Sequence, residues 1–188
     1  MMLKTMSGRL IDILNPDQNV IDIDDIVIGL SQQNRYAGQT PVPFSVGQHI
    51  IAIMAYIDDE MPSLEDRYRR AALMHDFPEY VLQDLTNPFK IVLSQYTNVY
   101  DDLTIRWENA IVQRFGWFES GRDYRQAYDE HTKQLDRECY FAEAVHLNLP
   151  AHNIERHHPT MLLAVQWAAG MSISQVQQKL RYYIQREG

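Results

Sequence analysis

The chain has 188 residues, with 17 basic and 25 acidic side chains, a formal net charge of -8 and one cysteine. The length predicts a single domain, residues 1–188, and the acidic balance excludes a nucleic-acid polymer as main partner while leaving room for a mononucleotide. Because Cys139 can form no internal disulfide and no apolar run approaches the ~20 residues of a membrane span, we expect a cytoplasmic protein without membrane contact.

The first predicted element is a short β-hairpin. Two alternating apolar runs, 10–13 and 20–23, flank a turn signal at Asn15-Pro16, and this pattern is typical of paired strands. Asp24 or Asp25 can then cap the first helix.

A loop follows that carries Arg35 and Tyr36, and ligand contacts are often made from such irregular backbone. The next helix begins with a capping box, because Ser45 precedes Gln48 by three positions ahead of an apolar run. His49 lies in the first turn of this helix. Alone, it fits a structural or solvated role better than a metal ligand.

The central motif is the adjacent pair His75-Asp76 at the end of an apolar helical run. Neighbouring side chains diverge by about 100° on a helix, so both can reach one ion only near a helix end. Pro78 supplies that end. Glu79 and Asp84 follow, so that several carboxylates gather beside a metal bound there. A solvated His-Asp pair is the alternative interpretation.

A short helix after Glu79 is predicted to end near Asn87-Pro88, ahead of Lys90. Amphipathic periodicity predicts further helices over 101–115, 124–149, 160–169 and 174–184. Asp136 lies beside the apolar stripe of the second of these, where a carboxylate is costly unless it pairs with a cation or donor. A partnered surface carboxylate is the plainer interpretation. The predicted fold class is all-α, mostly helical, with a small N-terminal β-hairpin.

Together, His49, His75, Asp76 and Asp136 resemble the four ligands of the HD-domain metal-dependent phosphohydrolases, in which a His, a His-Asp pair and a later Asp occur in that order on separate helices. The segments 35–40, 44–49, 73–76 and 84–90 resemble the compact phage and prophage branch of that family, as does the spacing from Asp136 to Glu143. The likeness covers residues 8–149.

Three departures from the pattern concern residues that are not ligands. Gly47 stands where the family usually has Ala, Gln83 where it has Gly before Asp84, and Phe77-Pro78 where it has a small pair. The last two affect the shape of the loop that carries Asp84.

The resemblance implies an HD-domain fold and hydrolysis of deoxynucleotides with a divalent transition metal. Two imidazoles and two carboxylates suit Mn²⁺, Co²⁺, Fe²⁺ or Zn²⁺, and Mg²⁺ can accompany the substrate phosphates. Such an ion polarises a phosphate and lowers the pKa of a bound water. Glu79 and Asp84 are implied as proton-transfer or water-orienting groups, with Asp84 the better candidate to protonate the leaving oxygen.

On the substrate side, the resemblance implies that Arg35 and Lys90 bind phosphate oxygens. Exposed salt bridges are the bland alternative for both. Tyr36 or Phe44 can stack on a base, although core packing is the plainer role for either.

The family branch hydrolyses either the triphosphate or the monophosphate of a deoxynucleoside. We predict a dNTP triphosphohydrolase, with dATP as the favoured substrate, and keep a 5′-deoxynucleotidase as the alternative. Additional cations near the phosphates, for which Arg67, Arg69 and Arg70 are candidates, would favour the triphosphate. Relatives of this kind are usually oligomers, so a homo-oligomer is expected, in the host cytoplasm if a phage encodes it.

Three rivals come from other classes. A di-iron bundle is one, because 143–146 reads Glu-x-x-His, but such bundles need that motif on two helices. His152, His157 and His158 with Glu155 form a second group, for which a solvated loop is the plainer interpretation. The third rival is a metal- and nucleotide-binding protein without turnover.

Overall fold

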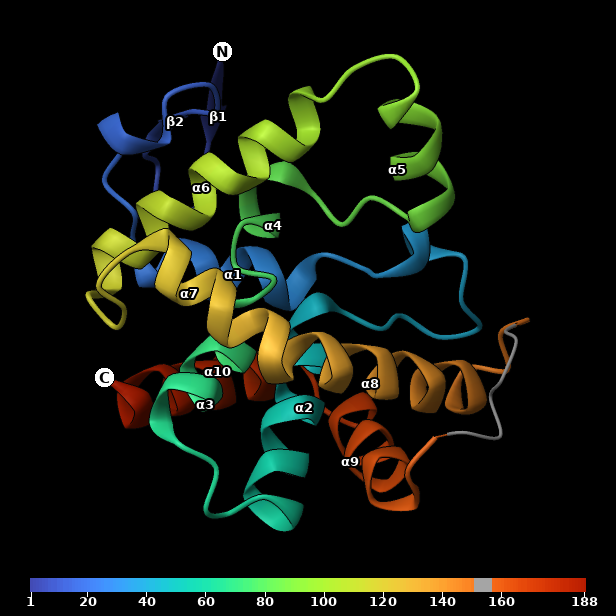
Figure 1. Cartoon of the computed structure of the whole chain (residues 1–188). Coiled ribbons are helices and arrows are strands. Elements are labelled where there is room, and N and C mark those ends of the chain that lie inside the picture. Colours follow the sequence, from blue (N-terminus) through green and yellow to red (C-terminus); the bar gives the residue numbers. More distant parts are fainter. Residues whose placement is uncertain (151–156) are drawn as a thin grey trace.

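In the computed structural model, which describes residues 1–150 and 157–188, the chain is mostly helical and begins with a small antiparallel β-hairpin (Figure 1). The predicted fold class is confirmed. The elements in chain order are β1 Met2–Lys4, β2 Leu10–Asp12, α1 Ile23–Gln32, α2 Val46–Glu60, α3 Asp66–Met74, α4 Glu79–Leu82, α5 Asn87–Ser94, α6 Val99–Phe115, α7 Gly121–Ala127, α8 Lys133–His146, α9 Pro159–Ala169 and α10 Ile173–Glu187. Among the described helices, none combines the length and the apolar character that crossing a bilayer requires.

The hairpin lies nearer the N-terminus than the alternating pattern predicts. Leu3 of β1 pairs with Ile11 of β2, and Gly8 makes the turn between the strands at a φ of 88°, a left-handed conformation that glycine adopts without strain. Residues 20–23 form no strand, and Asn15-Pro16 begins a short 3₁₀ turn instead. The predicted partner strand was wrong because alternation does not reveal which run pairs with which.

The cap of α1 is Asp22, not Asp24 or Asp25 as predicted. Its carboxylate accepts a hydrogen bond from the backbone N–H of Asp24 at 2.8 Å, which satisfies one of the free donors of the first turn. Asp25 is buried and accepts from the backbone N–H and the hydroxyl of Ser7 at 3.2 and 2.8 Å. It therefore ties the hairpin turn to α1.

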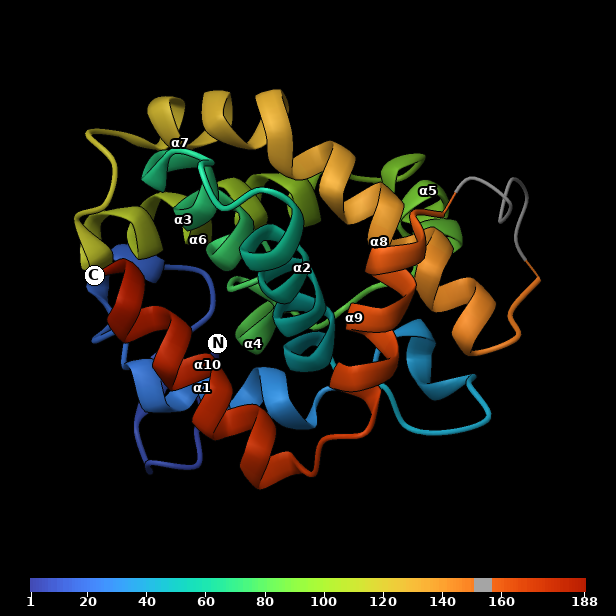
Figure 2. The same ribbon diagram turned by 90° about the horizontal axis from the view of Figure 1, so that it is seen from below.

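Helix α2 is the helix around which the others pack. It contacts α1, α3, α8, α9 and α10, and Figure 2 shows it between α3, α8, α9 and α10. Every residue from 44 to 54 is buried. The capping box of Ser45 and Gln48 is confirmed, so the sequence correctly placed the start of the helix that carries His49.

Gln48 also joins the first turn of α2 to the end of α9. Its Oε1 accepts from the backbone N–H of Ser45 at 2.7 Å, while its Nε2 lies 3.1, 3.3 and 3.4 Å from the carbonyl oxygens of Ala168, Ala169 and Met171. One buried amide thus serves two helix ends.

We expect Gln48→Ala to lower the free energy of unfolding by about 2–4 kcal/mol, because it leaves the buried N–H of Ser45 without its acceptor and removes the hydrogen bonds that tie α2 to the end of α9. Gln175 is a matched control, since it forms the same capping box with Ser172 but is exposed; Gln175→Ala should cost only about 0.5–1 kcal/mol. Urea titration of both variants measures the difference. Equal losses would show that the link to α9 stabilises nothing.

Gly47 has a packing reason for departing from the resembled pattern. A Cβ atom at this position would lie 2.7 Å from Cγ1 of Val176 and 3.1 Å from the carbonyl oxygen of Leu30. Helices α1 and α10 therefore approach α2 too closely for alanine. The C-terminal helices, which contribute little to the resemblance, are part of the packing that positions α2.

The segment after α3 differs from the prediction at residues 87–88. Asn87-Pro88 begins α5 instead of ending a helix, because proline fits the first helical turn, where its missing N–H is not needed. Gln83 ends α4 at a φ of 71° and ψ of 151°, a conformation strained for any residue but glycine. No residue of α5 is buried, and Figure 1 shows this helix at the edge of the molecule.

The long helix predicted over 124–149 is divided. A π-helical turn, Tyr128–Thr132, separates α7 from α8, and helical periodicity cannot distinguish such a turn from continuous α-helix. The turn lies four residues before Asp136, and π-helical turns of this kind are common near functional sites.

Candidate metal centre

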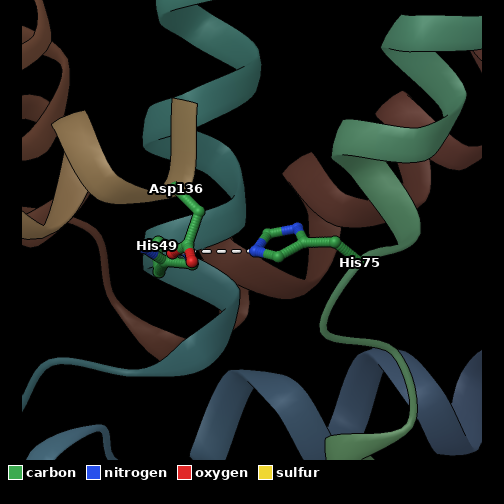
Figure 3. Close-up of side chains that lie close together, drawn as sticks. All are labelled: His49, His75 and Asp136. Atoms are coloured by element: carbon green, nitrogen blue, oxygen red, sulfur yellow. Dashed lines mark hydrogen bonds and ion pairs between the residues drawn. The ribbon is translucent and has the colours of Figure 1, made fainter. Parts of the chain in front are cut away.

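Four side chains converge where α2, α3 and α8 meet. His49 comes from α2, His75 and Asp76 from the turn that follows α3, and Asp136 from α8; Figure 3 shows His49, His75 and Asp136 pointing toward one another. Nε2 of His49 lies 3.2 Å from Nε2 of His75, 3.2 Å from Oδ1 of Asp136 and 3.6 Å from Oδ2 of Asp76. The structure thus brings together all four residues that the sequence singled out as metal ligands.

The turn after α3 allows adjacent residues to face one point. His75 closes α3, and Pro78 precedes the first turn of α4. The backbone N–H of Phe77 donates to Met74 at 3.0 Å and that of Glu79 to Asp76 at 3.0 Å, so the chain bends sharply between the two helices. As a result, Oδ2 of Asp76 lies 3.1 Å from Nε2 of His75.

Both imidazoles are oriented through their other ring nitrogen. Nδ1 of His75 lies 2.8 Å from the carbonyl oxygen of Ala72, which can only accept, so Nδ1 carries the proton and Nε2 faces the centre. Nδ1 of His49 lies 2.5 Å from Oε1 of Glu143, a carboxylate with no exposed area. Metal-binding histidines are held in this way by carbonyl and carboxylate groups. The centre contains groups that could bind a metal ion.

The carboxylates and imidazoles of the centre shift one another's pKa values. Burial opposes ionisation of Asp76, yet His75 and His49 hold its pKa well below the ordinary value. Burial and Arg35 oppose the charge of His49, but Glu143 and Asp136 raise its pKa well above the ordinary value. The protonated form of His49 is therefore favoured, and a metal ion that binds to its Nε2 would have to displace that proton.

We expect the affinity for Co²⁺ to rise about tenfold per pH unit while His49 is protonated, because the ion must displace that proton. Calorimetry in buffers of different ionisation enthalpy should find about one proton released for each ion bound below the pKa of His49. An affinity that stays constant between about pH 6 and pH 8, with no proton release, would contradict this assignment of the proton.

Glu79 and Asp84 line a cavity of about 460 Å³ beside the four side chains. Within the described residues, Oε2 of Glu79 is buried without a hydrogen-bond partner. Burial, together with Asp76 and Asp84, raises the pKa of Glu79 well above its ordinary value. Burial also raises the pKa of Asp84, against the opposing charges of Arg35 and Lys90. This pair of carboxyl groups therefore retains a proton at pH values where an exposed pair would be ionised.

Among the described residues, three cationic side chains line the same cavity: Arg35, Lys90 and Arg137. Arg137 was not singled out from the sequence, although it directly follows Asp136. The three arginines considered as additional candidates lie elsewhere in ion pairs or backbone contacts: Arg67 with Asp123, Arg69 with Asp58 and Glu187, and Arg70 with the carbonyl oxygen of Glu187.

The two aromatic candidates have different surroundings. Phe44 is fully buried in the core, so the packing role is confirmed and stacking on a ligand is wrong for it. Tyr36 lines the cavity and its hydroxyl donates to Glu143. Tyr140 and Leu149 add aromatic and apolar surface to the same cavity.

Glu79 also lines a second cavity of about 460 Å³. His75, Asp76, Glu79 and Lys90 line it together with Tyr100, Arg125 and Tyr128. Asp76, Glu79 and Lys90 border both cavities. Both cavities therefore border the centre.

The structure describes some of the residues of the two rival metal-binding groups, the Glu-x-x-His motif and the histidine cluster. Glu143 faces His49, so in the described structure it does not pair with His146 as a Glu-x-x-His ligand set. His152 and Glu155 lie outside the described residues, and the ring of His158 packs against Tyr56 with centroids 5.4 Å apart.

The role of Glu143 in holding His49 was missed at the sequence level. Its spacing from Asp136, two helical turns on one face of α8, is the signal that could have indicated it.

Comparison with known proteins gives relatives but no activity. No family model matches the chain. An uncharacterized protein of Rhodobacter capsulatus is 37% identical over 116 residues, which cover 60% of this chain and 57% of the relative. The uncharacterized protein YfdR of Escherichia coli strain K12 is 32% identical over 103 residues, which cover 54% of this chain and 53% of the relative. The matches thus span little more than half the length of these curated relatives.

Proposed function

We propose that the chain is a metal-dependent hydrolase that converts a deoxynucleoside triphosphate, dATP in the first place, into deoxynucleoside and triphosphate. The observation that carries this proposal is the convergence of two imidazoles and two carboxylates beside a cavity whose described lining includes three cations. A purely structural metal site would need neither the cations nor the protonated carboxyl pair.

The donor set fits a divalent transition metal. Two imidazole nitrogens and two carboxylate oxygens suit Mn²⁺, Co²⁺, Fe²⁺ or Zn²⁺, and the orienting partners of both imidazoles are already in place. When bound, the ion would supply Lewis-acid polarisation of the phosphate and activation of a water molecule.

The side chains account for the remaining requirements of the reaction. Arg35, Lys90 and Arg137 bind phosphate oxygens, whose charge is largest in a triphosphate. Water attacks the α-phosphorus, the bond from phosphorus to O5′ breaks, and O5′ takes up a proton. Glu79 supplies that proton, since its pKa is raised by burial and by Asp76 and Asp84, while Asp84 takes the proton that the attacking water loses.

A 5′-deoxynucleotidase is the second candidate, because the same centre could hydrolyse a deoxynucleoside monophosphate. The nucleotidase is favoured by the position of Arg67, Arg69 and Arg70, which lie outside the cavity in other contacts. Arg137 favours the triphosphate, because a single phosphate bound by Arg35 would leave the further cations of the cavity without a partner. A metal- and nucleotide-binding protein without turnover is the candidate from another class.

The test is incubation of the protein with the four dNTPs and the four matching monophosphates in Co²⁺ or Mn²⁺, followed by chromatography. Deoxyadenosine and intact triphosphate from dATP are expected. Orthophosphate from monophosphates alone would replace this proposal with the nucleotidase. Nucleotide binding without any product would favour the binding protein.

A further inference from the structure

Glu143 connects two parts of the molecule that lie far apart in the sequence. Its Oε1 lies 2.5 Å from Nδ1 of His49, and its Oε2 lies 3.1 Å from Nε of Arg35 and also accepts from the hydroxyl of Tyr36. The thiol of Cys139, one turn earlier on α8, lies 3.5 Å from Oε1. Both oxygens of this fully buried carboxylate are therefore engaged.

The loop that carries Arg35 and Tyr36 is strained. Tyr36 and Ala37 follow each other at φ values of 58° and 52°, and two consecutive residues with side chains rarely occupy the left-handed region. The backbone N–H of Gly38 donates to Arg35 at 3.0 Å, and that of Gln39 donates to Tyr36 at 2.9 Å. Such strain persists only where surrounding contacts hold it, and it collects at ligand-binding loops.

Glu143 lies outside the loop and accepts hydrogen bonds from Arg35 and Tyr36. The same carboxylate orients His49. We infer that Glu143 is a positioning residue that couples metal binding at His49 to the conformation of the substrate loop, residues 35–38. The inference rests on the proposed function, because it requires a metal at the centre and a substrate phosphate at Arg35.

The coupling follows from what Arg35 contacts. Its Nε is held by Glu143, whereas its Nη1 lies 3.4 Å from Oδ2 of Asp76, a proposed metal ligand. An ion that takes the charge of Asp76 weakens this second, longer contact and leaves the terminal nitrogens of Arg35 for a phosphate. The contact from Nε to Glu143 still holds the guanidinium in the lining of the cavity. Metal binding therefore favours the loop conformation in which Arg35 can bind a phosphate. By thermodynamic linkage, that loop conformation raises the affinity for the metal by the same factor.

The experiment measures Co²⁺ affinity by calorimetry, and hydrogen exchange of the Gly38 and Gln39 amides with and without Co²⁺. Tyr36→Phe removes only the hydroxyl that the loop donates to Glu143. We expect it to weaken Co²⁺ binding by about tenfold and to reduce the protection that Co²⁺ gives to the two amides. Tyr140→Phe is the matched control: it removes a hydroxyl from the same cavity, outside the contacts described for Glu143, and should leave Co²⁺ affinity unchanged.

Glu143→Gln should weaken Co²⁺ binding by about 10- to 100-fold, because the amide cannot accept from His49 and Arg35 with equal strength. The Tyr36 variant keeps the test decisive if this buried substitution unfolds the protein. Wild-type Co²⁺ affinity in Tyr36→Phe, or amide exchange that Co²⁺ does not slow, would overturn the coupling while leaving the metal centre intact. Failure of the wild-type protein to bind Co²⁺ would overturn both the coupling and the proposed function.

Discussion

Replacing His75 by alanine is expected to abolish measurable Co²⁺ binding and to lower the turnover of dATP by about 10³-fold or more. The substitution removes one of the two imidazoles whose Nε2 atoms lie 3.2 Å apart. An ion held at this position would supply several kcal/mol of transition-state stabilisation, and each ~1.4 kcal/mol corresponds to a factor of ten in rate. Because the main hydrogen bond of His75 is to a backbone carbonyl in its own turn, we expect the fold to persist.

A second histidine provides the control. His131 lies in the π-helical turn before α8, and its ring packs against Tyr68 with centroids 4.1 Å apart. His131→Ala should retain Co²⁺ affinity and turnover, and far-ultraviolet circular dichroism should show that both variants are folded. If His75→Ala kept Co²⁺ affinity and stayed within tenfold of the wild-type turnover, the ion would be held by other residues.

The convergence of the four candidate metal ligands is the part of the molecule that the sequence predicts best. His75 and Asp76 are adjacent, and Pro78 makes their helix end visible in the local pattern. The start of α2 is equally local, because the capping box of Ser45 and Gln48 lies within four residues. Local signals of this kind are available without knowledge of the tertiary structure.

The features that the sequence did not predict depend on long-range packing. Glu143 and Tyr36 are separated by 107 positions. Their hydrogen bond exists only because the fold brings α8 next to the loop that precedes α2 in the sequence. The link from Gln48 to the end of α9 spans 120 positions. The strand β1 was missed and the strand predicted at residues 20–23 was wrong for a related reason: a run forms a strand only if a partner segment lies beside it, and an alternating pattern does not show where that partner lies.

Replacing Glu79 by glutamine is expected to lower kcat by about 10²- to 10⁴-fold and to remove the alkaline limb of the pH profile. Burial, together with Asp76 and Asp84, raises the pKa of Glu79, so in the wild type kcat should fall as pH rises through this pKa and the proton is lost. Glutamine keeps the shape of the side chain but has no transferable proton. Asp84→Asn should instead remove the acidic limb. If Asp84→Asn removed the alkaline limb, Asp84 would be the acid, as the family resemblance implies.

The same raised pKa predicts how stability depends on pH when EDTA keeps the protein free of metal. Between the ordinary value of 4.5 and the raised value, the folded state holds a proton on Glu79 that the unfolded chain has lost. The free energy of unfolding therefore falls by about 1.4 kcal/mol per pH unit across this range, and no further above it. Glu79→Gln cannot ionise, so its stability relative to the wild type should rise with pH through the same window. Urea titrations from about pH 4 to pH 9 measure the gap between the two proteins, and a gap independent of pH would mean that Glu79 is ionised in the folded state and cannot serve as the acid.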